Sequence, residues 1–338
     1  MKEINAGLTT KDVFQELSEC GKPIQEWGKA VDGSPMLSVR SGGDKQPRIF
    51  ITAGAHSTET AGVHAAINMI EDLETDHEVH ILPLRDPYGF AGVKHCLSFA
   101  AAQPVNVSNH MEAYDYLNRQ AEKLWHEGEM HLFKLGKVGF VWDKGAPGLG
   151  SYWNITNRIE ALSTEDPETL RPLWGKSVMM IDPLSGVEGA QAMQRCWHAL
   201  FDSKGKWLHL NRMFGLDDAV PEVAAVDKLM QTIRPGLTLD LHEGNGQGFW
   251  LPIPKPRENV ERSFKMAKAF FDYVHLRGYP VTDYEEWLAT DRTPQTAIDP
   301  GWMKPEPRLP GLFWVDTRAR GEGHNLMSYA ELYGVAFG

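Results

Sequence analysis

The sequence is poor in cysteine and has no long apolar run. Its 338 residues include only three cysteines, Cys20, Cys96 and Cys196, which are widely spaced. An odd, sparse set of this kind is not a disulfide framework and indicates reduced thiols in a cytosolic compartment. No apolar run approaches the roughly 18 residues that a membrane-spanning helix needs. The first residues, MKEINAGLTTKDVFQEL, also lack the apolar stretch of a secretory signal. These absences predict a cytoplasmic protein without a membrane partner.

Basic residues are fewer than acidic ones. The chain has 34 Lys and Arg against 45 Asp and Glu, a formal net charge of −11. Such a balance repels phosphate backbones and acidic lipid surfaces, so we expect no nucleic-acid partner. With 42% hydrophobic and 23% charged residues, the composition is that of a globular protein with a core large enough to support a defined site. The oligomeric state does not follow from these numbers.

The spacing of apolar residues indicates an α/β arrangement in the first third of the chain. Residues 48–53 form a compact apolar run that is typical of a buried strand in a parallel sheet. Helical periodicity follows over residues 59–73, and a second short strand is expected at 78–84. Strand, helix and strand in this order form a βαβ unit. A hairpin is expected before them, over residues 28–43.

The rest of the chain is less even. Residues 99–206 show irregular patterning, with one amphipathic helix expected over 111–127, and we interpret them as a large insertion that covers one face of the sheet. Regular elements return as a helix over 221–233, a strand over 237–241 and a helix over 259–276, with a last strand expected over 326–331. No internal repeat divides the chain, and residues 1–338 are expected to form a single domain.

Two of the expected strands end in a histidine. His56 follows the strand at 48–53, and His242 follows the strand at 237–241. In open α/β sheets ligands gather beyond the carboxyl ends of the strands, so these two imidazoles can meet although they are distant in sequence. Glu59 lies at the start of the next helix and adds a carboxylate. Two histidines and one glutamate leave a zinc ion with an open position for water, as in catalytic sites.

Each of these signals has a simpler explanation. A histidine at a strand end is more often a hydrogen-bonded structural residue, and H-x-x-E arises by chance in many proteins of this size. Thirteen histidines also supply other pairs. His77 and His80 lie on an alternating strand, and His126 and His131 lack the i, i+4 spacing of a helical zinc motif, so we interpret both pairs as surface residues.

Several further segments resemble the zinc carboxypeptidase family, and they occur in the order that the family shows. They are GKAVDGSPM (28–36), GAHSTETAG (54–62), LPLRDPYGF (82–90), LNRMF (210–214), LDLH (239–242) and SYAEL (328–332). Together they span nearly the whole chain. The resemblance implies a mixed, largely parallel central sheet with helices on both faces. It also implies that His56, Glu59 and His242 bind Zn²⁺.

The resemblance further implies roles for residues outside the metal set. Arg212, assisted by Asn211, would clamp a substrate carboxylate in a bidentate fork. Glu331 would be the general base toward the metal-bound water and then the general acid toward the leaving amine. Glu243, next to His242, is a further carboxylate, for which we favour a supporting role.

One feature departs from the family pattern. The family places an arginine after the Asn-Pro turn to stabilise the oxyanion, but residues 90–103 contain no arginine here. Lys94 or His95 could donate to an oxyanion instead, as could Arg158 from the insertion. The insertion is also longer than usual, so we expect the pocket roof to differ from that of the family.

The sequence leaves the substrate class open. The expected activity is zinc-dependent hydrolysis of an amide next to a carboxylate-bearing group, at a peptide C-terminus or in an N-acyl amino acid. Glu59-Thr-Ala-Gly62 is closer to the deacylases of the aspartoacylase and succinylglutamate desuccinylase kind, whereas Tyr88-Gly89-Phe90 is closer to the peptidases. A metal-dependent esterase is also consistent with these residues, as is a non-catalytic protein that binds a carboxylate or a partner on the same fold.

Overall fold

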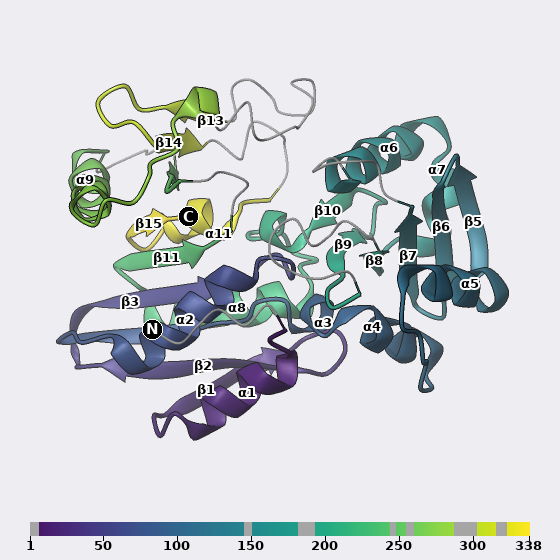
Figure 1. The fold of residues 1–338 in the computed structure, drawn as a ribbon, viewed down its shortest axis with the longest axis horizontal. Coiled ribbons are helices and arrows are strands. Elements are labelled where there is room, and N and C mark those ends of the chain that lie inside the picture. The colour runs from purple at the N-terminus through teal and green to yellow at the C-terminus, as the bar shows by residue number, and fades with distance from the viewer. Residues whose placement is uncertain are drawn as a thin grey trace.

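Two lobes lie side by side in the protein (Figure 1). The structure is a computed structural model and describes residues 7–144, 151–181, 193–243, 248–254, 260–286, 303–315 and 323–338. The main lobe contains a six-stranded sheet and a small three-stranded sheet, and the second lobe contains another six-stranded sheet. Within these ranges, we find no helix with the length and apolar character needed to cross a membrane.

The strands of the main sheet lie in the order β1-β2-β4-β3-β11-β15. Their bounds are β1 (Ile24–Lys29), β2 (Pro35–Gly42), β3 (Lys45–Ala53), β4 (His77–Leu82), β11 (Leu237–Leu241) and β15 (Val335–Phe337). β1, β2 and β4 pair antiparallel, with the expected hairpin between β1 and β2. β4, β3, β11 and β15 pair parallel. The predicted mixed α/β class is confirmed, with two antiparallel pairs beside three parallel ones.

Helices pack on both faces of the main sheet. Their bounds are α1 (Thr10–Glu19), α2 (Thr60–Asp72), α8 (Pro221–Ile233) and α9 (Val260–Leu276). Side chains alternate along β3, so Phe50 and Ile51 point to opposite faces. Phe50 belongs to one apolar cluster with Leu229 of α8, whereas Ile51 belongs to another with Ile70 of α2. The helices expected over 59–73 and 221–233 therefore cover the sheet from its two sides.

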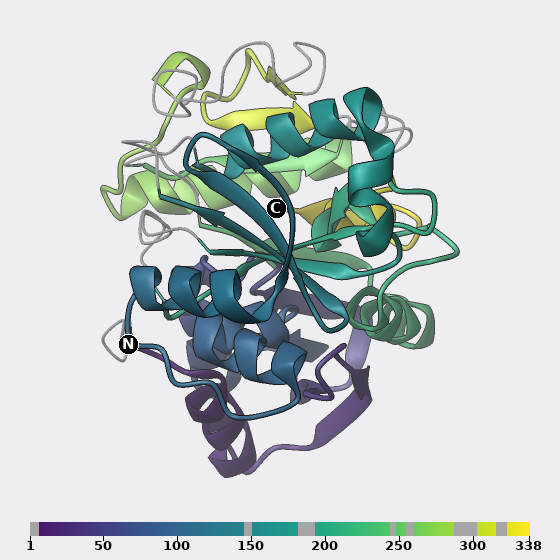
Figure 2. The same cartoon turned by 90° about the vertical axis from the view of Figure 1, so that its right-hand side faces the viewer.

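The second lobe is more regular than its sequence indicates. Its strands lie in the order β10-β9-β8-β7-β6-β5, beside the main sheet (Figures 1 and 2). They are β5 (Glu122–Glu127), β6 (Met130–Leu135), β7 (Val138–Asp143), β8 (Ser177–Ile181), β9 (Trp197–Phe201) and β10 (Trp207–His209). The accompanying helices are α3 (Pro87–Phe90), α4 (Gly92–Ala101), α5 (His110–Gln120), α6 (Ser151–Glu165), α7 (Pro167–Leu170) and the 3₁₀ turn η1 (Arg171–Leu173). The prediction of an irregular segment is therefore wrong.

Two of the expected elements differ from those observed. The helix expected over 111–127 ends at Gln120, because Glu122–Glu127 pairs with β6 as β5 and this pairing overrides the local helical pattern. The strand expected over 326–331 is instead the helix α11 (Leu326–Ala330). Its N-cap is Asn325, which accepts a hydrogen bond of 2.8 Å from the Ser328 N–H. The small sheet, in the order β12-β14-β13, completes the main lobe with β12 (Leu251–Pro254), β13 (Met303–Pro305) and β14 (Leu312–Val315).

A buried polar junction joins the two lobes. Asp86 follows β4 and caps α3, where its Oδ1 accepts a hydrogen bond from the Gly89 N–H at 2.9 Å. The same oxygen lies 3.1 Å from His198 Nδ1 on β9, and His198 Nε2 lies 2.9 Å from Ser177 Oγ on β8. The side chains of Asp86 and His198 are fully buried. Burial acts to lower the pKa of His198, but the Asp86 carboxylate outweighs it and raises this pKa above its ordinary value.

Replacing His198 by Asn should destabilise the protein by about 3–5 kcal/mol at pH 6, because it leaves the Asp86 carboxylate buried without its charged partner. The raised pKa means that the folded state holds this proton more tightly than the unfolded chain. The corresponding stability is fully present below the unfolded pKa of about 6.5 and is lost as the pH rises through the folded pKa. Urea unfolding at pH 6 and pH 9 should therefore show a difference between wild type and variant that narrows at pH 9. A difference that is equal at both pH values would contradict a charged His198.

Candidate metal centre

The predicted ligands His56, Glu59 and His242 lie together at the carboxyl-terminal edge of the main sheet. His56 follows β3 and His242 follows β11, and these strands pair in parallel with Ala53 opposite Leu241. The two strands therefore end at the same level of the sheet, and the side chains beyond them converge. Glu59 is the N-cap residue of α2 and reaches the same place from the helix start.

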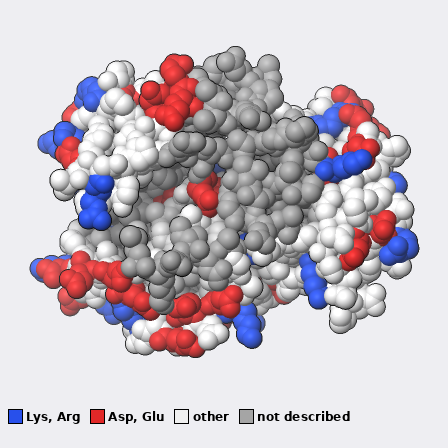
Figure 3. Space-filling view, in the orientation of Figure 1, with Lys and Arg blue, Asp and Glu red and all other residues white. Residues whose placement is uncertain are grey.

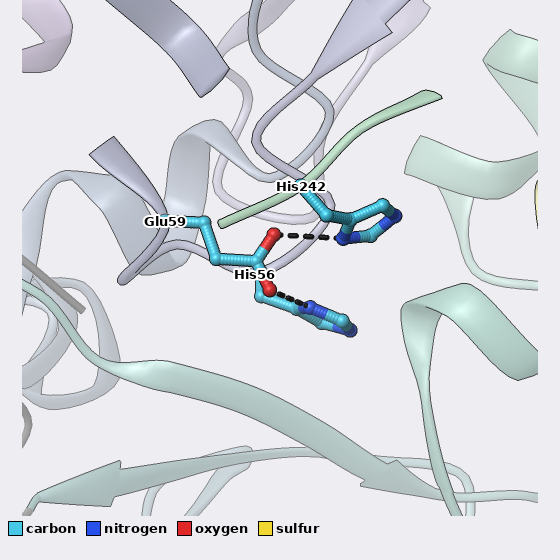
Figure 4. A group of neighbouring side chains, drawn as sticks. All are labelled: His56, Glu59 and His242. Atoms are coloured by element: carbon cyan, nitrogen blue, oxygen red, sulfur yellow. Dashed lines mark hydrogen bonds and ion pairs between the residues drawn. The ribbon is translucent and has the colours of Figure 1, made fainter. Parts of the chain in front are cut away.

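The Glu59 carboxylate lies between the two imidazoles (Figure 4). Its Oε1 is 2.5 Å from His56 Nδ1, and its Oε2 is 2.7 Å from His242 Nδ1. The ring centroids of His56 and His242 are 5.1 Å apart. One ligand atom from each of the three residues lies within 4.8 Å of the others. Two imidazole nitrogens and a carboxylate oxygen are a donor set that zinc accepts in catalytic sites, with the fourth position left open, so the residues present fit this metal.

A carboxylate on the side of the His242 ring away from Glu59 fixes the orientation of that ring. Its Nε2 lies 3.0 Å from Asp240 Oδ2, so Nδ1 is the nitrogen that faces Glu59. A carboxylate on the far nitrogen is the usual partner of a metal-binding histidine, because it holds the ring and its tautomer. Asp240 in turn accepts hydrogen bonds from Arg85 Nη2 at 2.8 Å on each of its two oxygens.

Two carboxylates, those of Glu59 and Asp240, contact the two ring nitrogens of His242. Burial alone would lower the pKa of His242, but the Asp240 and Glu59 carboxylates outweigh it and raise this pKa to about 10. Burial acts to raise the pKa of Glu59, yet the imidazoles of His56 and His242 hold it below its ordinary value. Burial lowers the pKa of His56, which keeps its imidazole neutral, as a metal ligand must be.

The second lobe supplies one wall of the centre. The ring of Trp197, at the start of β9, stacks on His56 with centroids 4.6 Å apart and an angle of 16° between the planes. A stacked indole restricts the tilt of the His56 ring without competing for its nitrogens, since the contact is through the ring face. The ring of His209 lies 5.2 Å from that of His56. Between the lobes, the Ser57 hydroxyl donates a hydrogen bond to the Cys196 carbonyl. The position of His56 therefore depends on both lobes.

A cavity of about 210 Å³ opens onto the three predicted ligands. Its lining includes the polar and charged residues Asn211, Arg212 and Glu243. It also includes the apolar residues Trp250, Pro252, Met303, Val315 and Met327. A group that combines a charged end with an apolar body matches such a cavity.

The two predicted substrate-binding residues lie in this cavity. Asn211 and Arg212 belong to the 3₁₀ turn η3 (Leu210–Arg212) and are buried. Arg212 Nη1 donates to the Asn211 carbonyl at 2.7 Å, and Asn211 Oδ1 accepts from the Leu326 N–H at 3.0 Å. Glu243 accepts a hydrogen bond of 2.9 Å from the Ala61 N–H. Burial raises the pKa of Glu243 above its ordinary value.

The other four predicted site residues are not among the described residues that line the cavity. Glu331 is the C-cap residue of α11. Lys94 Nζ donates to Asn106 Oδ1 at 2.9 Å, and His95 Nε2 lies 2.7 Å from Asp32 Oδ2. Arg158 pairs with Glu127 at 2.7 Å and with Glu165 at 2.9 Å on the second lobe.

Reasoning from the sequence missed Arg85 and Trp197. A signal for Arg85 was present, because it follows the strand expected over 78–84 and must lie at the same sheet edge as the strand-end histidines. Trp197 gave no such signal, since its place beside His56 depends on how the second lobe docks.

Removing one ligand should weaken zinc binding strongly. In the variant His242→Ala, we expect zinc affinity to fall by more than about 100-fold, beyond the 10- to 100-fold typical for residues that only support a ligand. Competition with a chromophoric chelator would measure this affinity. His126→Ala, at an exposed histidine of the second lobe, is the matched control and should bind zinc like the wild type. Equal zinc affinity of the two variants would exclude His242 as a ligand.

Compared with known proteins, the sequence matches no family model and no curated relative. Solved structures that align with this chain include a proposed metallopeptidase from Shewanella amazonensis, with 13% identity, a TM-score of 0.40, and coverage of 97% of this chain and 81% of the other. Carboxypeptidase A from Helicoverpa armigera gives 13% identity and a TM-score of 0.40, with 97% and 61% covered. The murein-tripeptide amidase MpaA from Escherichia coli gives 15% and 0.37, with 95% and 84% covered. These alignments cover nearly the whole of this chain, at low identity and with TM-scores below 0.5.

Proposed function

We propose that this protein is a zinc-dependent hydrolase that cleaves an amide bond next to a carboxylate-bearing group. The observation that carries the proposal is the pair of Nδ1 atoms that converge on one carboxylate, His56 and His242 on Glu59, inside a cavity that also contains Arg212. A zinc ion held there would act as a Lewis acid on the carbonyl and lower the pKa of a bound water toward about 7.

Arg212 is proposed to bind the carboxylate of the substrate. It is the one Lys or Arg among the described residues that line the cavity. The net charge of −11 gives no general attraction for an anion, and on the face that Figure 3 shows, acidic side chains gather along the lower edge of the main lobe. A carboxylate must therefore be recognised locally, and a buried guanidinium does this with two parallel hydrogen bonds.

Glu243 is proposed to carry the proton during hydrolysis. Of the carboxylates that line the cavity, Glu59 lies between the two imidazoles and Asp240 is held by Arg85, which leaves Glu243. Its Oε2 is fixed by the Ala61 N–H, and a carboxylate that faces the cavity beside His242 can accept a proton from water and return it to the leaving group. The prediction from the sequence, Glu331, is the competing assignment, and isosteric variants separate the two.

The apolar residues that line the cavity favour a substrate that is small and partly hydrophobic. Trp250, Met303 and Met327 line the same cavity as the predicted ligands, and their apolar side chains would limit the access of water to the reacting bond. An N-acyl amino acid or a short peptide has this combination of acid and apolar group.

A non-catalytic role, as a carboxylate-binding protein, is favoured by one observation. Among the described cavity residues Arg212 would have to serve both the substrate carboxylate and the oxyanion.

The variant Glu243→Gln should keep zinc affinity and lose turnover by about 100-fold or more, the scale of a general base. The assay uses zinc-loaded protein with N-acyl amino acids, dipeptides and the corresponding esters. Glu331→Gln is the matched control and should turn over like the wild type. The opposite result would assign the proton transfer to Glu331. Carboxylate binding without turnover of any of these substrates by the wild type would favour the non-catalytic role.

The variant Arg212→Lys should lower kcat/KM for a substrate with a free carboxylate by about 10- to 100-fold, since a lysine keeps the charge but cannot form the fork. The same substrate with its carboxylate converted to an amide reports the rest of the reaction. For that amide the kcat/KM values of the wild type and of Arg212→Lys should differ little. An equal loss on both substrates would mean that Arg212 acts elsewhere than on the carboxylate.

A further inference from the structure

Arg85 is a buried cation directly behind the predicted metal ligands. It follows β4, and only 4% of its surface is exposed. Its backbone is fixed by a hydrogen bond of 3.0 Å from the Arg85 N–H to the Ala53 carbonyl at the end of β3. A buried guanidinium is costly unless its hydrogen bonds are made in good geometry. Its partners therefore indicate what this cation does.

The main partner of Arg85 is Asp240. Arg85 Nη2 donates to Oδ1 and to Oδ2 of Asp240, each at 2.8 Å. Oδ2 is also the atom that lies 3.0 Å from His242 Nε2. With both oxygens bound to the guanidinium, the Asp240 carboxylate cannot rotate freely, and the oxygen that meets His242 keeps its place. The ring of His242 then presents Nδ1 to Glu59, at 2.7 Å.

Arg85 also contacts the substrate side of the cavity. Its Nη1 and Nη2 lie 3.3 and 3.4 Å from Asn211 Oδ1. Asn211 precedes Arg212, and the Arg212 guanidinium donates to the Asn211 carbonyl at 2.7 Å. Arg85 therefore contacts Asp240, which supports the predicted ligand His242, and also Asn211, which belongs to the same turn as Arg212.

We infer that Arg85 is a positioning residue for the metal centre: its guanidinium holds Asp240 so that His242 offers Nδ1 to the metal. The inference rests on the proposed metal-dependent function. It assigns Arg85 no contact with the substrate or with the metal. The role depends on the shape of the guanidinium, because its rigid plane holds Asp240 through Nη2 while Nη1 and Nη2 reach Asn211 Oδ1. The ammonium group of a lysine has no such plane and cannot hold both partners in a fixed relation.

A role in charge neutralisation alone predicts a different result. Removing a cation near the site would, by Coulomb attraction alone, strengthen the binding of Zn²⁺. Loss of positioning instead weakens it. Arg85→Lys keeps the charge and removes the planar guanidinium that reaches Asp240 and Asn211 together, so any loss of zinc affinity in this variant comes from geometry. Arg85→Met removes both, and the sign of its effect shows which contribution is larger.

The test is zinc affinity by chelator competition for the full chain, wild type against Arg85→Lys and Arg85→Met. We expect both variants to bind zinc about 10- to 100-fold more weakly, as is usual when the partner of a metal-binding histidine is disturbed. Arg48→Lys and Arg48→Met are the matched controls. Arg48 pairs with Glu78 at 3.1 Å near the opposite end of β3, and its variants should bind zinc like the wild type.

A second measurement uses the wild type alone and so does not depend on whether a variant folds. In the zinc-loaded wild type, long-range ¹H–¹⁵N NMR of the histidine rings should show His242 with its proton on Nε2. A proton on Nδ1 would overturn the inference, as would wild-type zinc affinity in Arg85→Lys or tighter binding in Arg85→Met. A wild type that binds no zinc would overturn the metal centre itself, whereas tight zinc binding with unaffected Arg85 variants would overturn only the role of Arg85.

Discussion

The parallel pairing of β3 with β11 is the constraint on which the rest of the site depends. Ala53 lies opposite Leu241, and so the chain leaves both strands at the same level of the sheet. His56 and His242 can then meet although they are distant in sequence. A slip of the pairing by one residue would turn the alternating side chains of β11 to the other face. Asp240 would then point away from His242 Nε2, and the support of that ring would be lost.

Much of the fold could be predicted because its elements carry local signals. The strand over 237–241 alternates leucines with polar residues and is followed by a histidine, and the helix over 221–233 begins with a proline and stops before Arg234-Pro-Gly. The helix α11 has five residues, too few to show a period, so only the capping by Asn325 defines it. β5 alternates weakly and is a strand because β6 lies beside it. The same limit applies to the second lobe as a whole, where long-range pairing decides the structure.

The candidate site also contains some features that the sequence predicts and others that it does not. Strand ends predicted the convergence of His56 and His242, because the edge of a parallel sheet is a property of order along the chain. The contact between Arg85 and Asp240 joins residues 155 positions apart, and no pattern within either segment indicates it. Glu331 was assigned through the resemblance of residues 328–332 to a segment of the family; it is the C-cap residue of α11, and its catalytic role stays a prediction.

The charges around His242 explain why these buried groups are stable together. Glu59 and Asp240 are both buried and both carry pKa values below their ordinary range, against the burial that acts to raise them. Arg85 neutralises one of these carboxylates, and in the metal-free protein the proton on His242, with its pKa of about 10, neutralises the other. A divalent cation among the three ligand atoms would take over the role of that proton and bring one further positive charge. Two carboxylates beside one imidazole are costly in an apolar interior, and either the proton on His242 or a cation between Glu59 and His242 offsets that cost.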